Sequence, residues 1–210
     1  TQTCGEIQNI KFNNVSFTYP NTDVEVLKNL NFEIKKGDKI GIFGPSGIGK
    51  STLFRLLLRF YDPNSGTISF NHIDLKDLSF NEIYQRIGML EQETYLFDDT
   101  IFNNIAIAKE GASLDEVKNA AEKAGIASLI DTLPEGYNTE MGQMASRLSG
   151  GEKQRIGIAR IMLACPDIIV MDEPTSALDV FHEKELLHTL KTEYSDATWL
   201  IISHRMSTLT

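Results

Sequence analysis

The chain has 210 residues, 41% of them hydrophobic, so it is long enough for one or at most two domains with a sizeable core. It carries 29 Asp and Glu against 20 Lys and Arg, a formal net charge of −9, and this acidity argues against a nucleic-acid partner. No apolar run approaches the roughly 20 residues of a membrane span, and the start shows no signal-peptide pattern. Two cysteines make no disulfide framework and favour a reducing compartment. These features disfavour a secreted miniprotein, a membrane-spanning chain and a nucleic-acid coat protein.

The first part of the chain is predicted to consist of short strands after a frayed start that includes Cys4. Residues 7–35 mix β-branched and aromatic residues with polar ones, and Pro20–Asn21 marks a turn. The alternation within 27–34 is typical of a half-exposed antiparallel strand. The apolar run 39–43 then precedes a glycine-rich loop and a helical pattern, which is the order of a phosphate-binding unit.

The middle of the chain is predicted to be helical. Ser113 and Glu116 have capping-box spacing, and apolar residues follow at helical spacing, namely Leu114, Val117, Ala120, Ala121 and Ala124. A second helix is expected from Gly150 to Ala164, ended by Pro166. Buried strands are expected at 167–173 and 197–204, with a helix at 179–194 between them.

These elements together predict an α/β fold of the P-loop NTPase class. An antiparallel β subdomain is expected at 1–36, and a parallel-sheet core is expected at 37–92 and 166–210. A helical insertion subdomain is expected at 93–165. All three would form a single domain.

The strongest local signal is GPSGIGKS, which fits G-x-x-x-x-G-K-[ST] between a strand and a helix. Glycines allow successive N–H groups to point at phosphate oxygens, and the helix N-terminus adds a positive dipole end. Lys50 would reach the β and γ phosphates, and Ser51 would ligate Mg²⁺. The alternative is an ordinary glycine-rich turn. The residues expected to contact the nucleotide are Gly44, Pro45, Ser46, Gly47, Ile48, Gly49, Lys50, Ser51 and Thr52.

The second signal is DIIVMDEP, a buried strand that ends in two carboxylates. Asp172 is expected to hold Mg²⁺, directly or through water. Glu173 is the candidate general base for the attacking water. The alternative is a solvated acidic pair at a strand end. With the glycine loop, this signal predicts hydrolysis of a nucleotide with Mg²⁺.

A narrower signal is LSGGEKQR, which begins at Leu148 and contains Ser149, Gly150, Gly151 and Glu152. A serine and free amides at the start of a helix can hold an anion. This run, shortly before DIIVMDEP, resembles the signature of the ATP-binding cassette (ABC) ATPases. The resemblance covers nearly the whole chain and implies a RecA-like core, ATP as the nucleotide and Mg²⁺ as the metal.

The resemblance also implies roles for residues outside these three motifs. Tyr19 in FTYP is similar to the aromatic residue that stacks on adenine. Gln92 is similar to the glutamine of the Q-loop, which ligates Mg²⁺ or holds a water. The run 176–179 is similar to the D-loop, and His204 is similar to the switch histidine that contacts the γ phosphate.

The run LFDDTIFNNI and the run SHRMST resemble the exporter-type branch of the family. This implies a second nucleotide-binding domain, identical or different, that pairs head-to-tail when ATP binds. It also implies a transmembrane domain as partner, and a place on the cytoplasmic face of a membrane for a soluble fragment of an integral protein. Gln143 and Met144 depart from the exporter pattern, and the chain is expected to lack the end of the usual domain.

Other interpretations remain for the whole chain and for single residues. A non-transport cassette is disfavoured because no coiled-coil insertion separates Ser51 from Leu148 and because the chain holds one cassette. A cassette that only binds ATP and regulates is disfavoured because the hydrolytic residues are present. Taken alone, Tyr19 fits a strand aromatic, Gln92 a surface residue, and Ser149 an N-cap. His204 alone fits a strand-end histidine, and the remaining histidines and Met141 and Met144 are interpreted as surface or filler residues.

Overall fold

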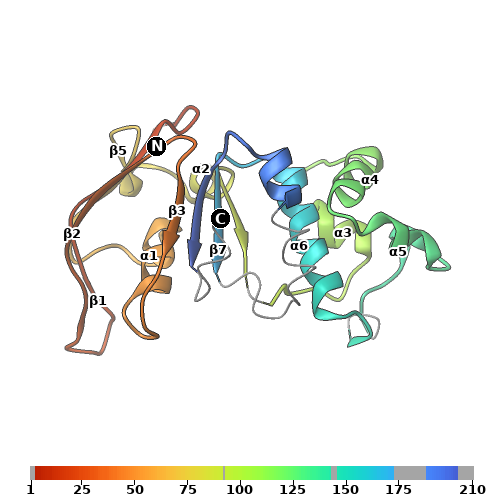
Figure 1. Cartoon of the computed structure of the whole chain (residues 1–210), viewed down its shortest axis with the longest axis horizontal. Coiled ribbons are helices and arrows are strands. Elements are labelled where there is room, and N and C mark those ends of the chain that lie inside the picture. The colour runs from red at the N-terminus through yellow and green to blue at the C-terminus, as the bar shows by residue number, and fades with distance from the viewer. Residues whose placement is uncertain (1–2, 92, 143–145, 173–187, 203–210) are drawn as a thin grey trace. The chain divides into compact units, whose positions relative to one another are not determined.

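The computed structural model describes residues 3–91, 93–142, 146–172 and 188–202 (Figure 1). It divides into two compact units. The first unit contains residues 1–87, 166–172 and 196–210, and the second contains 88–165 and 173–195. Several predicted residues lie outside the described ranges, namely Gln92, Gln143, Met144, Glu173, the run 176–179, His182 and His204.

The first unit opens with an antiparallel sheet whose strand order is β2-β1-β4-β5. Its strands are β1 (Asn9–Thr18), β2 (Glu25–Lys35), β4 (Ser65–Phe70) and β5 (Ile73–Asp74). Phe12 on β1 lies opposite Phe32 on β2, and their rings stack at 4.4 Å. One face of this sheet is buried, so apolar and polar residues alternate along β1. This alternation is the pattern from which the strands are predicted.

A second sheet has the order β3-β8-β7-β6. It contains β3 (Lys39–Ile42), β6 (Ile87–Leu90), β7 (Ile168–Asp172) and β8 (Thr198–Ile202). β8 pairs in parallel with both β3 and β7, which confirms the parallel core predicted from the apolar runs. β8 is buried at every position, and β7 at every position before Asp172. Continuous burial explains why both strands lack alternation.

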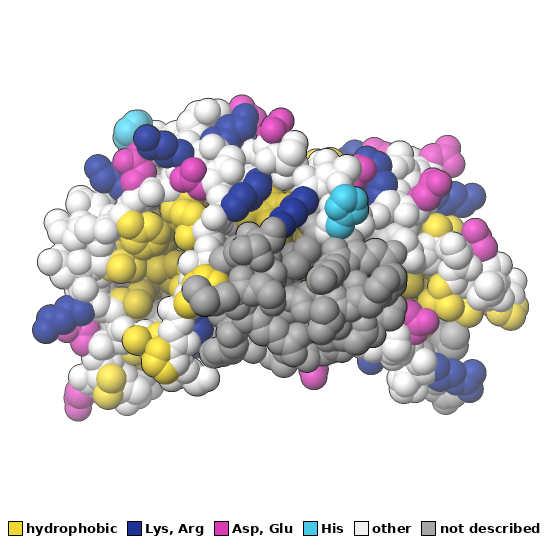
Figure 2. All heavy atoms as spheres, viewed as in Figure 1, with side chains coloured by type: hydrophobic (Ala, Val, Ile, Leu, Met, Phe, Trp, Pro, Cys, Tyr) yellow, Lys and Arg dark blue, Asp and Glu magenta, His cyan; other side chains and the backbone are white. Residues whose placement is uncertain are grey.

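Helix α1 (Lys50–Leu57) follows β3 and the glycine loop. Its buried residues are Thr52, Leu53, Phe54, Leu56 and Leu57. A 3-10 turn (Leu75–Asp77) and α2 (Phe80–Tyr84) complete this unit, each with a side-chain N-cap from Asp74 or Ser79. The visible faces of both units carry charged side chains of both signs, and hydrophobic atoms gather on the first unit beside the antiparallel sheet (Figure 2).

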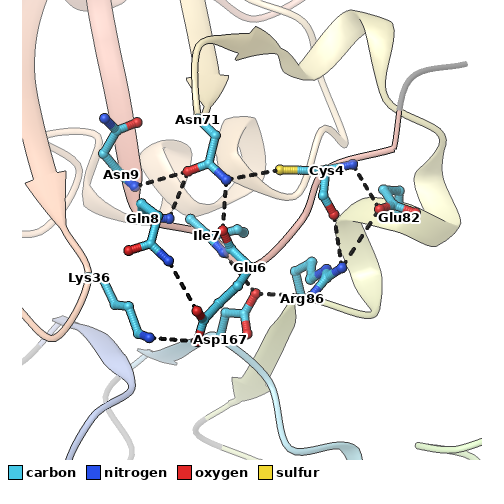
Figure 3. A network of polar contacts seen from close by, with 10 residues as sticks. All are labelled: Cys4, Glu6, Ile7, Gln8, Asn9, Lys36, Asn71, Glu82, Arg86 and Asp167. Atoms are coloured by element: carbon cyan, nitrogen blue, oxygen red, sulfur yellow. Dashed lines mark hydrogen bonds and ion pairs between the residues drawn. The ribbon is translucent and has the colours of Figure 1, made fainter.

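The expectation that the chain start is frayed at Cys4 is wrong, because Cys4 is only 2% exposed. Its backbone N–H donates to the Glu82 carboxylate at 2.9 Å, and its carbonyl accepts from Arg86 at 2.9 Å. Arg86 also contacts the Asp167 carboxylate, which in turn accepts the N–H of Ile7 (Figure 3). Side chains from α2, from the turn after it and from the residue before β7 therefore hold the first segment in place.

The second unit is helical. It contains α3 (Ile101–Ala106), α4 (Leu114–Lys123), α5 (Ala127–Thr132), a 3-10 turn (Gly136–Asn138) and α6 (Gly150–Ala164). Residues 188–193 are also helical. The predicted capping box at Ser113 and the predicted bounds of α6 are both confirmed. Leu114 departs from the predicted apolar stripe, since it is 45% exposed in the first turn of α4.

Two glycines of the first unit provide a test of how closely β1 and β4 pack. Gly66 on β4 has φ +79°, and a Cβ there would lie 2.3 Å from the carbonyl oxygen of Asn14. Gly37 has φ +84°, but a Cβ there would meet only the carbonyl oxygen of Asp196 at 3.9 Å. Both alanine variants place a side chain in the left-handed region, which costs about 1–2 kcal/mol. We expect Gly66→Ala to lose at least about 2 kcal/mol more than Gly37→Ala, because its Cβ displaces backbone. Urea denaturation measures both losses, and equal losses would contradict the close approach of β1 and β4.

Candidate functional site

The glycine loop joins β3 to α1, and its backbone adopts left-handed conformations that favour glycine. Gly47 and Gly49 have φ values of +83° and +100°. A Cβ on Gly49 would lie 2.9 Å from a Val26 methyl carbon and 3.2 Å from the Val26 carbonyl oxygen. The loop backbone therefore lies directly against the start of β2, and a side chain at Gly49 would push it away.

The N-terminus of α1 is suited to an anion. Gly49 offers no side-chain cap, and the first turn of this fully described helix has no acidic residue. The first N–H groups of a helix have no partner inside the helix, and its dipole favours negative charge there. Lys50 adds a cation, because its Nζ folds back over the loop to the carbonyls of Gly44 at 2.8 Å and Pro45 at 2.9 Å. This arrangement fits a phosphate chain bound to the loop.

The parallel sheet brings a carboxylate to the same edge as this loop. β3, β8 and β7 run in parallel, so their carboxyl ends share one edge. The loop follows the end of β3, and Asp172 is the last residue of β7. A carboxylate and the hydroxyl of Ser51 in the first turn of α1 are hard oxygen ligands of the kind that Mg²⁺ prefers. The residues at this edge therefore fit the magnesium ion that the sequence predicts.

Tyr19 lies beside α1, directly after β1. Its hydroxyl is 2.9 Å from the Thr52 hydroxyl and accepts a hydrogen bond from Arg55 at 2.9 Å. Its ring makes edge contacts with Phe17 and Tyr61. Thr52 is 5% exposed, and in this structure its hydroxyl faces Tyr19. The sequence reasoning missed that Thr52 and Arg55 hold the Tyr19 hydroxyl, because residues 33 and 36 positions apart show no pattern that links them.

The signature residues form the start of α6 in the second unit. Ser149 is the N-cap, and its Oγ accepts the N–H of Glu152 at 3.3 Å. The Glu152 carboxylate accepts both the backbone N–H of Ser149 at 2.7 Å and its hydroxyl at 2.9 Å. Gly150 and Gly151 form the first turn. The side chain of Glu152 thus satisfies both the backbone amide and the hydroxyl of Ser149 at the start of α6.

A surface groove of about 680 Å³ lies in the second unit after the segment that contains Gln92. Three large side chains near it are exposed, namely Tyr95 at 69%, Phe97 at 43% and Ile107 at 60%. Asn103 and the Thr100 backbone donate hydrogen bonds to Asp99 and lower the pKa of its carboxyl. We call this feature the α3 groove; it is lined by Phe97, Asp98, Asp99, Phe102, Asn103, Ala106, Ile107, Lys109, Glu110, Gly111 and Ala112. The sequence did not predict this groove, because a sequence does not show which of its apolar side chains remain exposed after folding.

The fold and this edge define a P-loop NTPase, with a parallel sheet, a glycine loop and a lysine at a helix N-terminus. The family described as "ABC transporter" matches residues 27–176 of the chain. The chain therefore belongs to the ABC transporter family, and it is an exporter-type nucleotide-binding domain, the class of domain that binds and hydrolyses ATP.

Several full-length relatives are similar to the chain. It is 45% identical over 200 residues to the ATM1-type heavy metal exporter of Novosphingobium aromaticivorans, a match that covers 95% of this chain and 33% of that protein. It is 44% identical over 202 residues to the mitochondrial iron-sulfur clusters transporter ATM1 of Kluyveromyces lactis, covering 95% and 28%. The chain thus spans about a third of the length of these relatives.

A solved structure gives the same result. The structure of a bacterial Atm1-family ABC exporter with ATP bound is 43% identical and superposes with a TM-score of 0.90, covering 98% of this chain and 36% of that one. In the described part of this chain, no helix is both long and apolar enough to cross a membrane.

The two capping boxes of the second unit offer a matched test of the signature serine. Ser113 and Ser149 cap α4 and α6 with the same pair of hydrogen bonds to a glutamate at the third position. Each serine-to-alanine change is expected to cost about 1 kcal/mol of stability in urea denaturation. Only Ser149→Ala is expected to slow ATP hydrolysis, by about tenfold or more, since a hydrogen bond to a charged oxygen is worth about 1.5–3 kcal/mol. Equal phosphate-release rates in the two variants would reduce Ser149 to an ordinary helix cap.

Proposed function

We propose that this chain binds ATP with Mg²⁺ and hydrolyses it at the cytoplasmic face of a membrane, as the motor of an exporter. One observation carries the proposal: the uncapped start of α1, with Lys50 folded over the glycine loop, lies at the sheet edge where Asp172 ends β7. Fold and site agree here, because ligands of parallel α/β sheets bind at the carboxyl ends of the strands.

The phosphates are held by the backbone amides from Gly44 to Thr52 and by Lys50, which leaves the loop carbonyls for the β and γ oxygens. Ser51, Asp172 and Gln92 hold Mg²⁺, which when bound neutralises charge on the phosphates. Tyr19 stacks its ring on the adenine, positioned through its hydroxyl by Thr52 and Arg55.

The hydrolytic step needs a water, a base and a stabiliser of the developing charge. Glu173 accepts the proton of the attacking water as the bond from its oxygen to the γ phosphorus forms and the β–γ bridging bond breaks. His204 donates a hydrogen bond to the γ phosphate. In the sequence, Glu173 directly follows β7 and His204 comes two residues after the end of β8, and the order along the chain supports these roles.

A second copy of the domain, or a different one, completes the site. Two described helix starts support this proposal, namely the uncapped start of α1 in the first unit and the serine-capped start of α6 in the second. Ser149, Gly150, Gly151 and Glu152 bind the ATP held by the partner's glycine loop, so two ATP molecules close a head-to-tail dimer and hydrolysis reopens it. The capping contact between Glu152 and Ser149 yields when the phosphate arrives.

The α3 groove takes a segment of the membrane-embedded part of the exporter. The relatives have about two thirds of their length outside the matching region, and the groove presents the exposed apolar side chains of Phe97 and Ile107. Asp98, Asp99 and Glu110 make its rim acidic, while Lys109 is paired with Glu116. An amphipathic segment with basic residues fits this surface.

Binding and hydrolysis can be separated with two variants. Lys50→Ala removes a charge-assisted contact worth about 1.5–3 kcal/mol, so we expect ATP affinity by calorimetry to fall roughly 10-fold to over 100-fold. Glu173→Gln keeps the shape of the side chain but loses the base, so ATP should bind while hydrolysis falls about 100-fold or more. Lys118→Ala, an exposed lysine on α4, is the control. Unchanged ATP affinity in Lys50→Ala would overturn the assignment of the phosphate loop.

The groove can be tested with two exposed aliphatic residues of the second unit. Ile107, 60% exposed, lines the α3 groove, whereas Leu114, 45% exposed, lies outside it on α4. In the membrane-reconstituted full assembly, Ile107→Ala is expected to lower ATP turnover several-fold, because about 1–2 kcal/mol of apolar contact with the membrane part is lost. Leu114→Ala should leave turnover within twofold. Equal turnover in both variants would remove the groove as a docking site.

A further inference from the structure

Arg160 on α6 is largely removed from solvent and reaches across to the segment that borders the α3 groove. Its Nε donates to the Asn104 carbonyl at 2.6 Å, and its Nη1 donates to the Tyr95 carbonyl at 2.9 Å. Its Nη2 donates to the Asn104 side-chain oxygen at 3.1 Å, and its guanidinium lies 5.8 Å from the Phe97 ring centre. One side chain of the signature helix therefore contacts both ends of this segment.

Asn104 holds the same segment from inside. It is 1% exposed, and its side-chain oxygen accepts the N–H of Phe97 at 2.9 Å. Its amide nitrogen donates to the carbonyls of Phe97, Asp99 and Thr100 at 3.0–3.2 Å. Residues 97–104 thus form a closed loop around one buried amide, and Arg160 joins this loop to α6. A displacement of the groove rim without the guanidinium would break the hydrogen bonds between them.

The helix also approaches the residues on either side of Gln92 closely. A Cβ on Gly157, one turn before Arg160, would lie 2.7 Å from the Thr94 hydroxyl and 3.1 Å from a Leu90 methyl carbon. The backbone of α6 therefore packs directly on this strand end and the segment after it. Ser149 at the start of the same helix has no such contact of its own with the groove among those described.

The hydrogen-bond partners of Arg160 indicate that this residue orients the segment and α6 rather than stabilising the helix. The oxygens that accept from Arg160 are neutral carbonyl and amide oxygens, and burial lowers the pKa of its guanidinium. Burying a cation against neutral acceptors is a costly way to stabilise a helix, and an apolar residue would pack at lower cost. The planar guanidinium instead fixes the orientation of α6 relative to the segment that accepts its hydrogen bonds.

We propose that Arg160 is a positioning residue that makes the groove segment 95–104 and the signature helix α6 move as one body, so that a load at the groove displaces Ser149. This inference rests on the proposed docking of the membrane part at the α3 groove. In this role Arg160 acts through the segment and through α6. Its loss therefore lowers turnover in the assembly at unchanged ATP binding.

A double-mutant cycle with Ile107→Ala tests this coupling in the membrane-reconstituted full assembly. Ile107→Ala and Arg160→Gln should each lower kcat about fivefold, while the KM for ATP stays within twofold. Because both changes interrupt the same connection, the double variant should be about as slow as the slower single variant. Independent effects would instead multiply to about 25-fold. Arg160→Lys, which keeps one charged donor, should recover part of the rate, and it replaces Arg160→Gln in the cycle if that variant does not fold.

Tyr194→Phe is the matched control for general loosening of α6. The Tyr194 hydroxyl donates to the Ile161 carbonyl at 3.0 Å, one residue beyond Arg160, and comes from a different segment. Its effect should multiply with that of Ile107→Ala. Multiplicative behaviour of Arg160→Gln, or an equal loss in Tyr194→Phe, overturns the positioning role and leaves the docking proposal standing. If Ile107→Ala alone has no effect, the docking proposal itself fails, and the inference fails with it.

Discussion

The close contact between the glycine loop and the start of β2 is the constraint on which the rest of the nucleotide site depends. Gly49 lies where any Cβ would strike Val26, so the backbone enters α1 in a conformation that leaves the first amides without side-chain caps. An uncapped helix start is unfavourable unless an anion or solvent satisfies it. The unsatisfied amides of this helix start lie next to the Lys50 cation. Amides and cation together favour the binding of a phosphate chain at this point.

In the proposed function, the elements around the loop orient the whole nucleotide. The antiparallel sheet supplies Tyr19, and the first turn of α1 supplies the Thr52 hydroxyl that fixes it. The parallel sheet supplies Asp172 at the matching edge. Apolar side chains of both sheets form the buried core. The polar groups of the proposed site lie at the ends of strands and the starts of helices. A change in the core can therefore weaken the unit without altering the chemistry at its edge.

The second unit solves a different problem, because α6 must carry the signature at one end and remain in register with a surface groove. Its capping box satisfies the helix start with the Glu152 carboxylate. Gly157 and Arg160 then set the distance and direction of the helix relative to the segment after Gln92. Small and charged residues perform these roles, whereas large apolar residues of α6 such as Ile156 and Ile161 fill the core.

The sequence by itself determined what depends on local spacing. The glycine loop, the capping box at Ser113, the bounds of α6 and the buried strand before Asp172 all follow from patterns of a few neighbouring residues, and the structure confirms them. Only the tertiary structure decided what depends on residues far apart in the chain. The burial of Cys4 requires α2, and the role of Thr52 requires β1. The contacts of Arg160 become visible only in the structure, where α6 lies beside Asn104. Hydrogen bonds between distant segments produce no periodic pattern in a sequence.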